Sequence, residues 1–496
     1  MHAETAPHTA NANRPLPDHS DVVIVGAGLS GIAAAYHIQD KCPGKSFAVL
    51  ESRAAMGGTW DLFRYPGIRS DSDMYTLGFS FNPWPNPKAI ADGPSILRYI
   101  KDTASKFGLD QHIHYNARVA EASWSDAEAR WTLTLAAQGD KPERRISAGF
   151  LFMCSGYYHY QEGYQPAFPG SETFAGRMLH PQQWSDDVVY EGKKVVVIGS
   201  GATAVTLVPE LAKKAEHVTM LQRSPTYIMT LPSEDRVANF LKRVLPDQTA
   251  HDLVRWKNIL LNLAFYKASK RWPQTVRRFI QKGIQKELGS HYEQRHFDPS
   301  YNPWDQRLCL VPDGDLFRAL KSGKAQVVTD TIRSFTERGI LLNSGQELEA
   351  DLVVTATGLK IQLLGGMQVR VNGELLDSGG MHCYKGVLFG GVPNFAVAIG
   401  YTNASWTLKC DLNCLFVVRL LNHMERKGYR MCTPQYDQAQ FGSEPLLDFD
   451  AGYIKRALDV LPRQGSRKPW KVYQNYLRDT LALRYGSVRD PYLAYR

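Results

Sequence analysis

Continuous runs of apolar residues, rather than alternating apolar and polar ones, recur along the chain. Four of them occupy residues 21–25, 46–50, 194–198 and 217–221. Strands buried on both faces of a parallel sheet have this pattern, whereas half-exposed strands alternate. The first and third runs lead directly into glycine-rich turns. The pattern therefore predicts two units of an α/β protein, each beginning with a strand, a turn and a helix.

The first glycine-rich turn has the spacing of a dinucleotide-binding loop. Gly26 permits the tight turn, Gly28 lets a pyrophosphate approach the backbone, and Gly31 lets the following helix pack on the strand. Ser30 adds a hydroxyl donor. The next strand closes with Glu51, whose carboxylate accepts hydrogen bonds from an adenosine ribose and repels a 2′-phosphate. This unit predicts an FAD site.

The second turn follows the run at 194–198 and differs at the end of its next strand. Its predicted nucleotide-binding residues are Gly199, Ser200, Gly201, Ala202, Thr203 and Ala204. Where the first unit has Glu51, the second has Gln222 and Arg223. An arginine there removes the repulsion and supplies a cation for a 2′-phosphate, so we expect NADPH. The alternative for Arg223 is an ordinary surface cation.

The two units also repeat at longer range. Each loop is followed by a polar, strand-rich stretch, at 113–135 and 325–342, and then by an apolar strand with glycine at its tip, at 150–156 and 351–358. This repeat predicts two Rossmann-like domains, with the NADP domain inserted in the FAD domain. The predicted segments are a disordered leader at 1–20, an FAD-binding domain at 21–160 and 350–496, and an NADP-binding domain at 161–349.

A helical insert without nucleotide motifs is predicted at about 234–300, inside the second domain. Residues 251–286 carry nine Lys or Arg and one Asp, and their apolar residues recur at intervals of three and four. We consider peripheral attachment to an anionic membrane through this basic insert. The favoured alternative is a solvated helical cap over the substrate cleft. Nearer the C-terminus, 411–424 and 475–484 are predicted as amphipathic helices.

Composition limits the remaining possibilities. The chain has 496 residues, of which 44% are hydrophobic and 22% charged, as in soluble globular proteins of two or three domains. The net charge of +9 favours anionic partners, and phosphorylated cofactors satisfy it. No nucleic-acid-binding motif is present, so we expect no nucleic-acid partner.

The seven cysteines form no CxxC pair, which predicts reduced thiols and no bound metal. The absence of a CxxC pair also argues against a disulfide reductase, although that class of enzyme has paired nucleotide-binding domains too. No apolar run approaches the ~18 residues of a membrane span, and the leader lacks the apolar segment of a signal peptide. We therefore expect a cytoplasmic protein, at most peripheral at a membrane.

Two further motifs carry a family resemblance. The tract between the two domains contains Phe174, Gly176, His180 and Trp184 in the spacing FxGxxxHxxxW, and residues 57–71 form a second signature. With the two loops, these motifs make the chain resemble the type I Baeyer–Villiger monooxygenases, from about Asp21 to the C-terminal region. Trp184 occupies the place where related N- and S-oxygenating flavoproteins usually differ.

The resemblance implies roles for particular residues. Contacts to FAD are implied for Thr59, Trp60, Asp61, Leu62, Asp71 and Val119, and contacts to NADP for Gly67, Ile68 and Arg69. The segment 401–406 is expected near the flavin. Arg307 would be the catalytic cation, with Asp71 as its partner. From the residues alone, Arg307 is more simply a structural ion pair, and Asp71 a helix N-cap. We expect His180 to fix how the two domains meet rather than to act as a base.

The implied reaction uses NADPH and O₂ to convert ketones into esters or lactones through a C4a-peroxyflavin. A fixed cation beside the flavin would stabilise the negative charge on the reacting oxygens. Sulfur-containing substrates would be oxidised as a side activity. Two alternatives stay open, namely an N- or S-oxygenating flavin monooxygenase and a non-catalytic flavin redox sensor.

Overall fold

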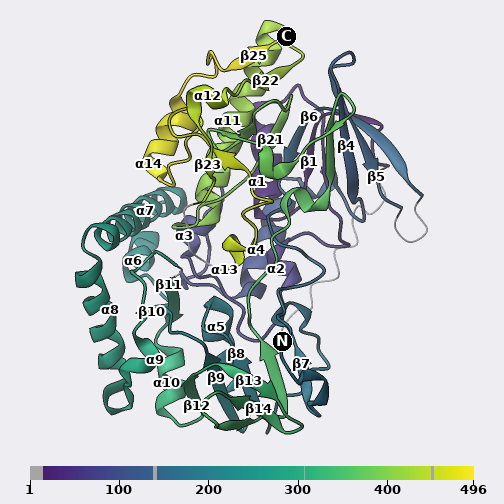
Figure 1. Cartoon of the computed structure of the whole chain (residues 1–496). Coiled ribbons are helices and arrows are strands. Elements are labelled where there is room, and N and C mark those ends of the chain that lie inside the picture. Colours follow the sequence, from purple (N-terminus) through teal and green to yellow (C-terminus); the bar gives the residue numbers. More distant parts are fainter. Residues whose placement is uncertain (1–14, 138–141, 307, 448–451) are drawn as a thin grey trace, which may run out of the picture.

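The protein consists of two sheet-based units with a helical arm along one side. The computed structural model describes residues 15–137, 142–306, 308–447 and 452–496. In Figure 1 the first sheet lies in the upper half, the second in the lower half, and α6 to α8 run along the left edge. The mixed α/β architecture and the parallel sheets predicted from the apolar runs are confirmed.

The first unit is built on an eleven-stranded sheet within the described residues. Its centre is β1 (His19–Val25), which pairs in parallel with β2 (Phe47–Leu50) and β6 (Arg144–Met153). The other strands are β3 (Ile113–His114), β4 (Val119–Ser125), β5 (Arg130–Leu135), β17 (Gln368–Val371), β18 (Glu374–Leu375), β19 (Cys383–Tyr384), β20 (Leu388–Phe389) and β21 (Phe395–Val397).

Two helices cover the centre of this sheet. Helix α1 (Leu29–Lys41) packs against α11 (Trp406–Lys427), and the side chains of Ile32 to Ala35 are fully buried there. Three consecutive alanines let the two helix axes approach closely. Helix α11 is buried on most of its surface, because α1, α3 and the C-terminal turns cover it from several sides. The amphipathic helix predicted at 411–424 is therefore a central one.

The second unit contains a five-stranded parallel sheet in the order β12, β9, β8, β16, β7. These strands are β7 (Arg177–Leu179), β8 (Lys194–Ile198), β9 (His217–Gln222), β12 (Ala325–Thr329) and β16 (Leu352–Thr355). An antiparallel sheet of β13 (Ile332–Phe335), β14 (Gly339–Leu342) and β15 (Glu347–Glu349) lies beside it. Helix α5 (Ala202–Leu211) follows β8, so the strand–turn–helix order predicted for both units is confirmed.

Two predicted domain boundaries differ from those in the structure. Strand β16 pairs with β8 and β7, so residues 352–355 belong to the second sheet, and the boundary predicted at residue 350 falls inside that unit. The chain returns to the first sheet only at β17. The predicted leader at 1–20 overlaps β1, because His19 and Ser20 already pair with β6. Residues 1–14 of that leader lie outside the described residues.

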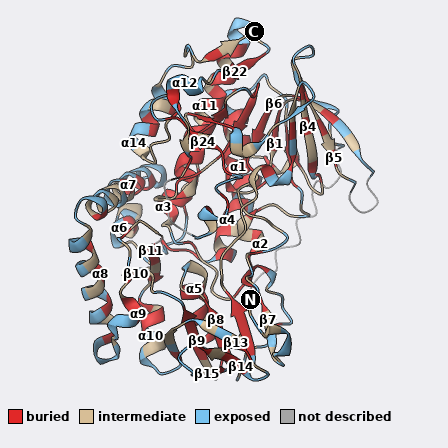
Figure 2. Cartoon of the chain, in the orientation of Figure 1, coloured by how far each residue is buried: buried red, intermediate tan, exposed pale blue. Residues whose placement is uncertain are grey.

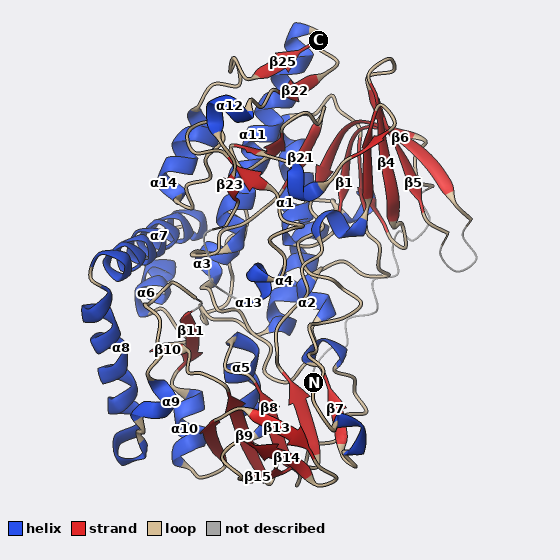
Figure 3. Ribbon diagram, viewed as in Figure 1, coloured by secondary structure: helices blue, strands red, loops and turns tan. Residues whose placement is uncertain are grey.

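The remaining elements form the helical insert, the C-terminal region and the connections (Figure 3). The helices are α2 (Thr59–Leu62), α3 (Met74–Leu77), α4 (Gly93–Lys106), α6 (Arg236–Val244), α7 (Asp247–Arg271), α8 (Pro273–Leu288), α9 (Gln294–Phe297), α10 (Asp315–Lys321), α12 (Gln438–Phe441), α13 (Gly452–Lys455) and α14 (Tyr476–Asp479). The strand pairs are β10 (Tyr227–Leu231) with β11 (Leu308–Pro312), β22 (Cys432–Pro434) with β25 (Leu493–Tyr495), and β23 (Glu444–Pro445) with β24 (Arg463–Gln464). Helices α6 to α9 lie within the segment predicted as the helical insert, 234–300.

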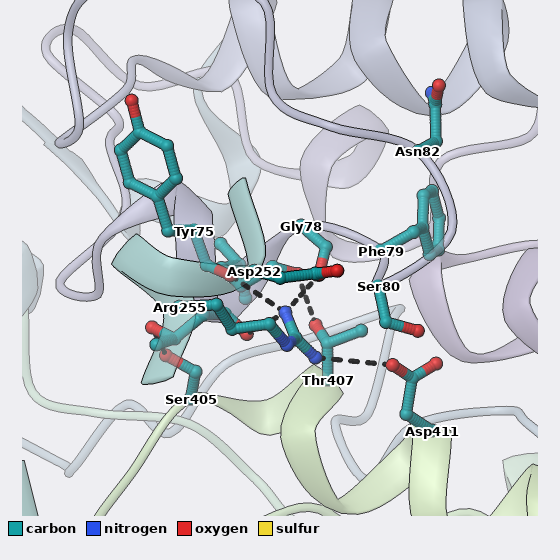
Figure 4. Close-up of polar contacts among 12 residues, drawn as sticks. Tyr75, Gly78, Phe79, Ser80, Asn82, Asp252, Arg255, Ser405, Thr407 and Asp411 are labelled. Atoms are coloured by element: carbon teal, nitrogen blue, oxygen red, sulfur yellow. Dashed lines mark hydrogen bonds and ion pairs between the residues drawn. The ribbon is translucent and has the colours of Figure 1, made fainter. Parts of the chain in front are cut away.

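A buried arginine fastens this insert to the first unit (Figure 4). Arg255 of α7 donates hydrogen bonds to the carbonyls of Tyr75 (2.8 Å) and Gly78 (2.9 Å), and it forms an ion pair with Asp411 of α11. Helix α8 packs on β10 and α10 of the second unit. The insert therefore bridges the two units. Its outer surface is largely exposed (Figure 2). No helix in the described ranges combines the length and apolarity needed to cross a membrane.

Candidate active site

A cavity of about 700 Å³ opens where the carboxyl ends of β1, β2 and β6 meet. Val25, Leu50 and Cys154, at or just after these strand ends, line it, as do Ala202 and Thr203 at the start of α5. The predicted FAD unit and the predicted NADP unit thus face one cavity. Ligands of open α/β sheets bind at the carboxyl ends of the strands, and the volume suits a cofactor or drug-sized molecule.

The first glycine-rich loop leaves its backbone open toward this cavity. Gly26 has φ +106°, and a Cβ on Gly31 would lie 1.8 Å from the carbonyl oxygen of Gly26. Gly28 caps α1 without any side-chain hydrogen bond, and its Cα faces Gly58. The first amides of α1 are therefore not capped by a side chain of the chain itself. This is the arrangement that binds a pyrophosphate at a helix N-terminus.

Glu51 lies in the cavity wall at the end of β2. Its Oε2 accepts a hydrogen bond from the amide of Ala27, and its Oε1 accepts one from the amide of Arg53, both at 2.9 Å. Burial raises the pKa of Glu51, while these amides and the Arg53 charge oppose that rise. A carboxylate held in this way can accept ribose hydroxyls. Val119, at the start of β4, lines the same end of the cavity.

The hydroxyl of Ser30 turns toward α11 rather than standing free. It accepts a hydrogen bond from Nε1 of Trp406 at 2.9 Å, and Trp406 stacks on Tyr157 with 4.9 Å between ring centroids. All three residues line the cavity. Of the segment 401–406, which was expected near the flavin, Tyr401, Ala404 and Trp406 line the cavity. Ser30 therefore positions an aromatic wall, in addition to the phosphate contact predicted for it.

The second signature contributes only part of its residues to the cavity. Thr59, Trp60 and Asp71 line it. Asp61 instead forms an ion pair with Arg53 (2.7 Å) and is buried behind the wall. Leu62 packs against the apolar core of the second unit. Within the described residues, neither Asp61 nor Leu62 lines the cavity, so any influence on FAD would act through their neighbours.

One member of the predicted catalytic pair lies among the described residues. Asp71 is exposed to the cavity, whereas Arg307 lies outside the described residues. Three residues further on, Leu310 of β11 lines the cavity. The N-cap alternative for Asp71 is wrong, because Asp73 caps α3 and accepts the Thr76 amide at 3.0 Å.

Residues 67–69 of the first unit contact helices of the second unit. Gly67 has φ +76°, and a Cβ there would lie 3.1 Å from the carbonyl oxygen of Thr206 in α5. Ile68 and Arg69 line the cavity, and Arg69 forms an ion pair with Asp315 at the start of α10. Sequence reasoning did not identify Asp315, because nothing local distinguishes it from other helix-terminal acids.

The second glycine-rich loop has the predicted backbone conformation, but some of its side chains contact other parts of the protein. A Cβ on Gly199, at φ +137°, would lie 2.4 Å from the carbonyl oxygen of Ala356, and Gly201 caps α5. Ser200 hydrogen-bonds to the hydroxyl of Thr226 at 2.8 Å. Arg223 is exposed at the end of β9.

The side chain of Gln222, which was predicted to contact NADP, points into the second unit. It is buried, and its amide group donates to the carbonyl of His296 (2.9 Å) and to the hydroxyl of Thr329 (2.8 Å). The Gln222 side chain is thus hydrogen-bonded inside the second unit, whereas the next residue, Arg223, is exposed to solvent at the end of β9.

The tract between the loops packs around the returning chain. Nε2 of His180 lies 3.0 Å from the carbonyl of Gly358, and Nδ1 accepts the Gln182 amide at 3.1 Å. Nε2 must therefore carry the proton, and burial lowers the pKa of this neutral imidazole. His180 does not line the cavity within the described residues. This geometry favours a role in positioning over a role as a base.

The other three residues of the tract pack locally. Phe174 meets Phe335 edge to face with 5.8 Å between centroids, and a Cβ on Gly176 would lie 2.4 Å from the Phe174 ring. Trp184 meets Tyr190 edge to face at 6.0 Å. All of these contacts lie around β7, at the edge of the second sheet.

Several tyrosines of the cavity wall were not predicted. Tyr65, Tyr158 and Tyr160 line it, and burial raises the pKa of Tyr160 to about 12. The hydroxyls of Tyr157 and Tyr158 are 2.8 Å apart. Their sequence signal is weak, since tyrosine is common in ordinary cores.

The family model "Flavin-binding monooxygenase-like" matches residues 19–364. The chain is 54% identical over 477 residues to the FAD-containing monooxygenase EthA of Mycobacterium tuberculosis (strain ATCC 25618 / H37Rv), covering 96% of this chain and 97% of that relative.

Two solved structures have the same fold. An oxidized steroid monooxygenase bound to NADP superimposes with a TM-score of 0.75 at 21% identity, covering 96% of this chain and 99% of that one. An ε-caprolactone-bound cyclohexanone monooxygenase superimposes with a TM-score of 0.74 at 20% identity, covering 96% and 100%.

Proposed function

Since the chain belongs to the flavin-binding monooxygenase-like family, we propose that it is an FAD- and NADPH-dependent Baeyer–Villiger monooxygenase, which converts ketones into esters or lactones with O₂. The single observation that carries this proposal is the shared cavity. Glu51 and the N-terminus of α1 line one side of it, and the N-terminus of α5 reaches the other side. Two dinucleotides bound at these helix ends would meet in one enclosed space.

The residues present fit FAD in the first unit. The uncapped N-terminus of α1 suits the pyrophosphate, the fixed Glu51 carboxylate suits the ribose, and the approach of Gly28 to Gly58 leaves no side chain between loop and cavity. FAD would supply the oxygen-activating redox chemistry, and NADPH the reducing hydride. The chain itself binds, orients and shields these groups.

The second unit favours NADPH over NADH. Arg223 is exposed beside the loop, and Gln222 carries no charge that would repel a 2′-phosphate. Arg69, held by Asp315, and Ile68 stand in the wall where the nicotinamide end would enter the cavity.

For the chemical step we propose Arg307 as the fixed cation and Asp71 as its partner. Negative charge develops on oxygen during the reaction, and a preorganised guanidinium stabilises it. Asp71 would hold the guanidinium in place from the cavity wall. His180 would hold the connection that leaves β16 against the end of β7 through its contact with Gly358, and in this way would influence how the two units meet.

Products, rather than cofactor consumption, test this proposal. The purified protein is incubated with FAD, NADPH and a panel of linear, cyclic and aryl ketones, and esters and lactones are measured by mass spectrometry. Formation of an ester from any ketone excludes a purely N- or S-oxygenating enzyme. If every NADPH consumed is recovered as H₂O₂ and no ketone product forms, the redox-sensor alternative is correct. Thioethers in the same panel test the proposed sulfoxidation, because sulfur nucleophiles take oxygen from the same oxidant.

We also propose that the outer face of α6 and α7 contacts an anionic membrane surface. Its exposed apolar side chains are Val237, Phe240, Val244, Leu253, Trp256, Leu260 and Leu261. The exposed charged residues on the same helices are Arg236, Arg243, Lys267, Lys270 and Arg271, against Asp247 and Asp252. Exposed apolar groups with a cationic surround suit an interface with acidic lipids.

Co-sedimentation with vesicles tests this contact. At low salt we expect binding to phosphatidylglycerol vesicles, little binding to phosphatidylcholine vesicles, and loss of binding in L260E/L261E. Leu375→Glu changes an equally exposed leucine on β18 and serves as the control. No binding of the unchanged protein to acidic vesicles would leave only the solvated-cap interpretation.

A further inference from the structure

A second, small cavity of about 30 Å³ lies between α7 and the C-terminal region. Ile259, Leu263 and Tyr266 of α7 form one wall of it. Two residues of its lining, Tyr401 and Ala404, also line the large cavity. The two spaces are therefore neighbours, and a wall only one or two side chains thick separates them.

Tyr401 is the substantial part of that wall, since Ala404 ends at Cβ. The Tyr401 side chain is buried, and its hydroxyl donates a hydrogen bond to Oδ2 of Asp479 at 2.7 Å. The same carboxylate oxygen lies 2.7 Å from Nζ of Lys409, which is 5.5 Å from the centroid of the Tyr401 ring. Both charged groups are buried, so this arrangement holds the ring in one position.

The small cavity offers hydrocarbon rather than polar groups. Two of its polar lining residues are engaged with neighbours: Asn403 donates to the carbonyl of Gln474 (3.0 Å), and Oε1 of Gln474 accepts the Thr402 amide (3.1 Å). Ile259, Leu263 and Leu408 contribute aliphatic side chains to the lining, and Asn262 of α7 lies at its edge. The end of an alkyl chain would be accommodated there, together with the space that the Tyr401 ring occupies, whereas a charged group would be costly.

The position of this cavity suits the distal end of a substrate. Tyr401 and Leu310 line the large cavity together with Asp71, the partner proposed for the catalytic cation. Arg53 and Val119 line it at the end that suits the adenosine. A ketone carbonyl held near Asp71 would leave its longer substituent to extend along the same cavity, whose wall includes Tyr401.

We propose that Tyr401 limits the length of the alkyl chain that the enzyme accepts, by closing off the small cavity under α7. This inference rests on the proposed ketone oxygenation and names a specificity-determining residue for it. Substrates whose chain ends before the Tyr401 ring fit the large cavity alone. Longer chains require the ring to be absent or displaced.

The test compares straight-chain 2-alkanones from 2-butanone to 2-dodecanone with the FAD-loaded protein and three variants. Tyr401→Ala opens the wall, Tyr401→Phe removes only the hydroxyl, and Y401A/L263W refills the space from the α7 side. Ester formation gives kcat/KM for each chain length. Equilibrium dialysis gives the Kd of each ketone without any turnover.

In Y401A we expect the preferred chain to lengthen and the ratio of kcat/KM for long over short ketones to rise by roughly tenfold or more. Each further buried methylene contributes about fourfold. The Kd ratios should shift in the same direction. Y401F should keep the chain-length order of the unchanged protein, and L263W should remove the gain made by Y401A. Leu263→Trp alone is measured as the reference for the double variant.

Three results would overturn the inference: an unaltered chain-length order in Y401A, an equal shift in Y401F, or no effect of L263W in the Y401A background. Should Y401A not fold, Tyr401→Leu removes the ring with a smaller loss of volume and carries the same expectations. If the unchanged protein forms no ester from any ketone, the proposed function fails, and the dialysis series still decides whether Tyr401 is the wall.

Discussion

Nη2 of Arg255 lies 3.2 Å from Oδ2 of Asp411 in a buried ion pair between α7 and α11. The other carboxylate oxygen of Asp411 is 3.3 Å from Nε2 of His37 in α1. Arg255 also satisfies backbone carbonyls at the end of α3. The guanidinium of Arg255 thus connects the helical insert to α3 and α11 of the first unit.

Arg255→Leu should lower the free energy of unfolding by about 3–5 kcal/mol, because it leaves Asp411 buried without its cationic partner. Urea unfolding followed by far-UV circular dichroism measures this loss. Arg278→Leu, which changes an exposed arginine on α8, should stay within about 0.5 kcal/mol of the unchanged protein. Adding Asp411→Leu to Arg255→Leu should recover part of the stability. Equal losses in R255L and R278L would contradict the role of the pair.

Stability should also fall in mild acid through His251. This side chain is fully buried on α7, and burial lowers its pKa to about 3, helped by the nearby charges of Arg255 and Lys242 and opposed by Asp411. In the unfolded chain, His251 binds a proton below about pH 6.5, whereas in the folded chain its imidazole stays neutral down to about pH 3. Stability is therefore lost as the pH falls through this window.

The expected loss between pH 7 and pH 5 is about 2 kcal/mol from this group. His251→Phe removes the proton-binding site, so its unfolding free energy should depend less on pH over the same interval. Denaturant titrations at the two pH values provide the measurement. Parallel pH dependences of H251F and the unchanged protein would assign the effect to other groups.

Glu51→Ala should weaken FAD binding by roughly ten- to a hundredfold, since a hydrogen bond to a charged group contributes about 1.5–3 kcal/mol. Reconstitution of the apoprotein, followed by flavin fluorescence, gives the Kd. Glu51→Gln keeps an acceptor oxygen for the Ala27 amide and separates loss of charge from loss of the loop contact. If FAD binds E51A as tightly as the unchanged protein, the ribose role of Glu51 is wrong.

Arg223→Ala should reduce the preference for NADPH over NADH by roughly ten- to a hundredfold, because it removes the cation proposed for the 2′-phosphate. The ratio of kcat/KM for the two nucleotides, measured from their oxidation rates, tests this. The matched control is Arg333→Ala, an exposed arginine on β13 of the same unit. A similar change in both variants would indicate a general charge effect.

His180→Ala should uncouple reduction from oxygenation while FAD content is retained. The substitution removes the hydrogen bond to Gly358 and opens space beside Gly163. We expect the yield of ester per NADPH to fall by about two- to tenfold, equivalent to one hydrogen bond, with H₂O₂ as the other product. Loss of FAD together with activity would instead assign His180 to cofactor binding.

Local patterns predicted much of the fold. The turn at Gly26 and the turn at Gly199 each need a positive φ directly after a buried strand, and the chain provides glycine at both. The helices of the insert follow from apolar residues at helical spacing. These features depend on residues within a few positions of one another, so a single sequence reveals them.

Prediction was less successful where a side chain has a choice of neighbours. Asp73, rather than Asp71, caps α3, because the helix begins at Met74. Asp61 turns away from the cavity toward Arg53, and Gln222 turns into the core toward His296. Each type of residue suited the predicted role equally well, and only the packed surroundings selected another partner.

By itself, the sequence of this protein determined two dinucleotide-binding units, their different charges at Glu51 and Arg223, and the helical insert inside the second unit. Only the tertiary structure decided that both loops face one cavity, that Asp315 holds Arg69, and that Tyr401 separates this cavity from a second one. The physical reason is range. Strand, turn and helix are set by backbone geometry over a few residues, whereas the walls of a site are set by close packing of segments far apart in the chain.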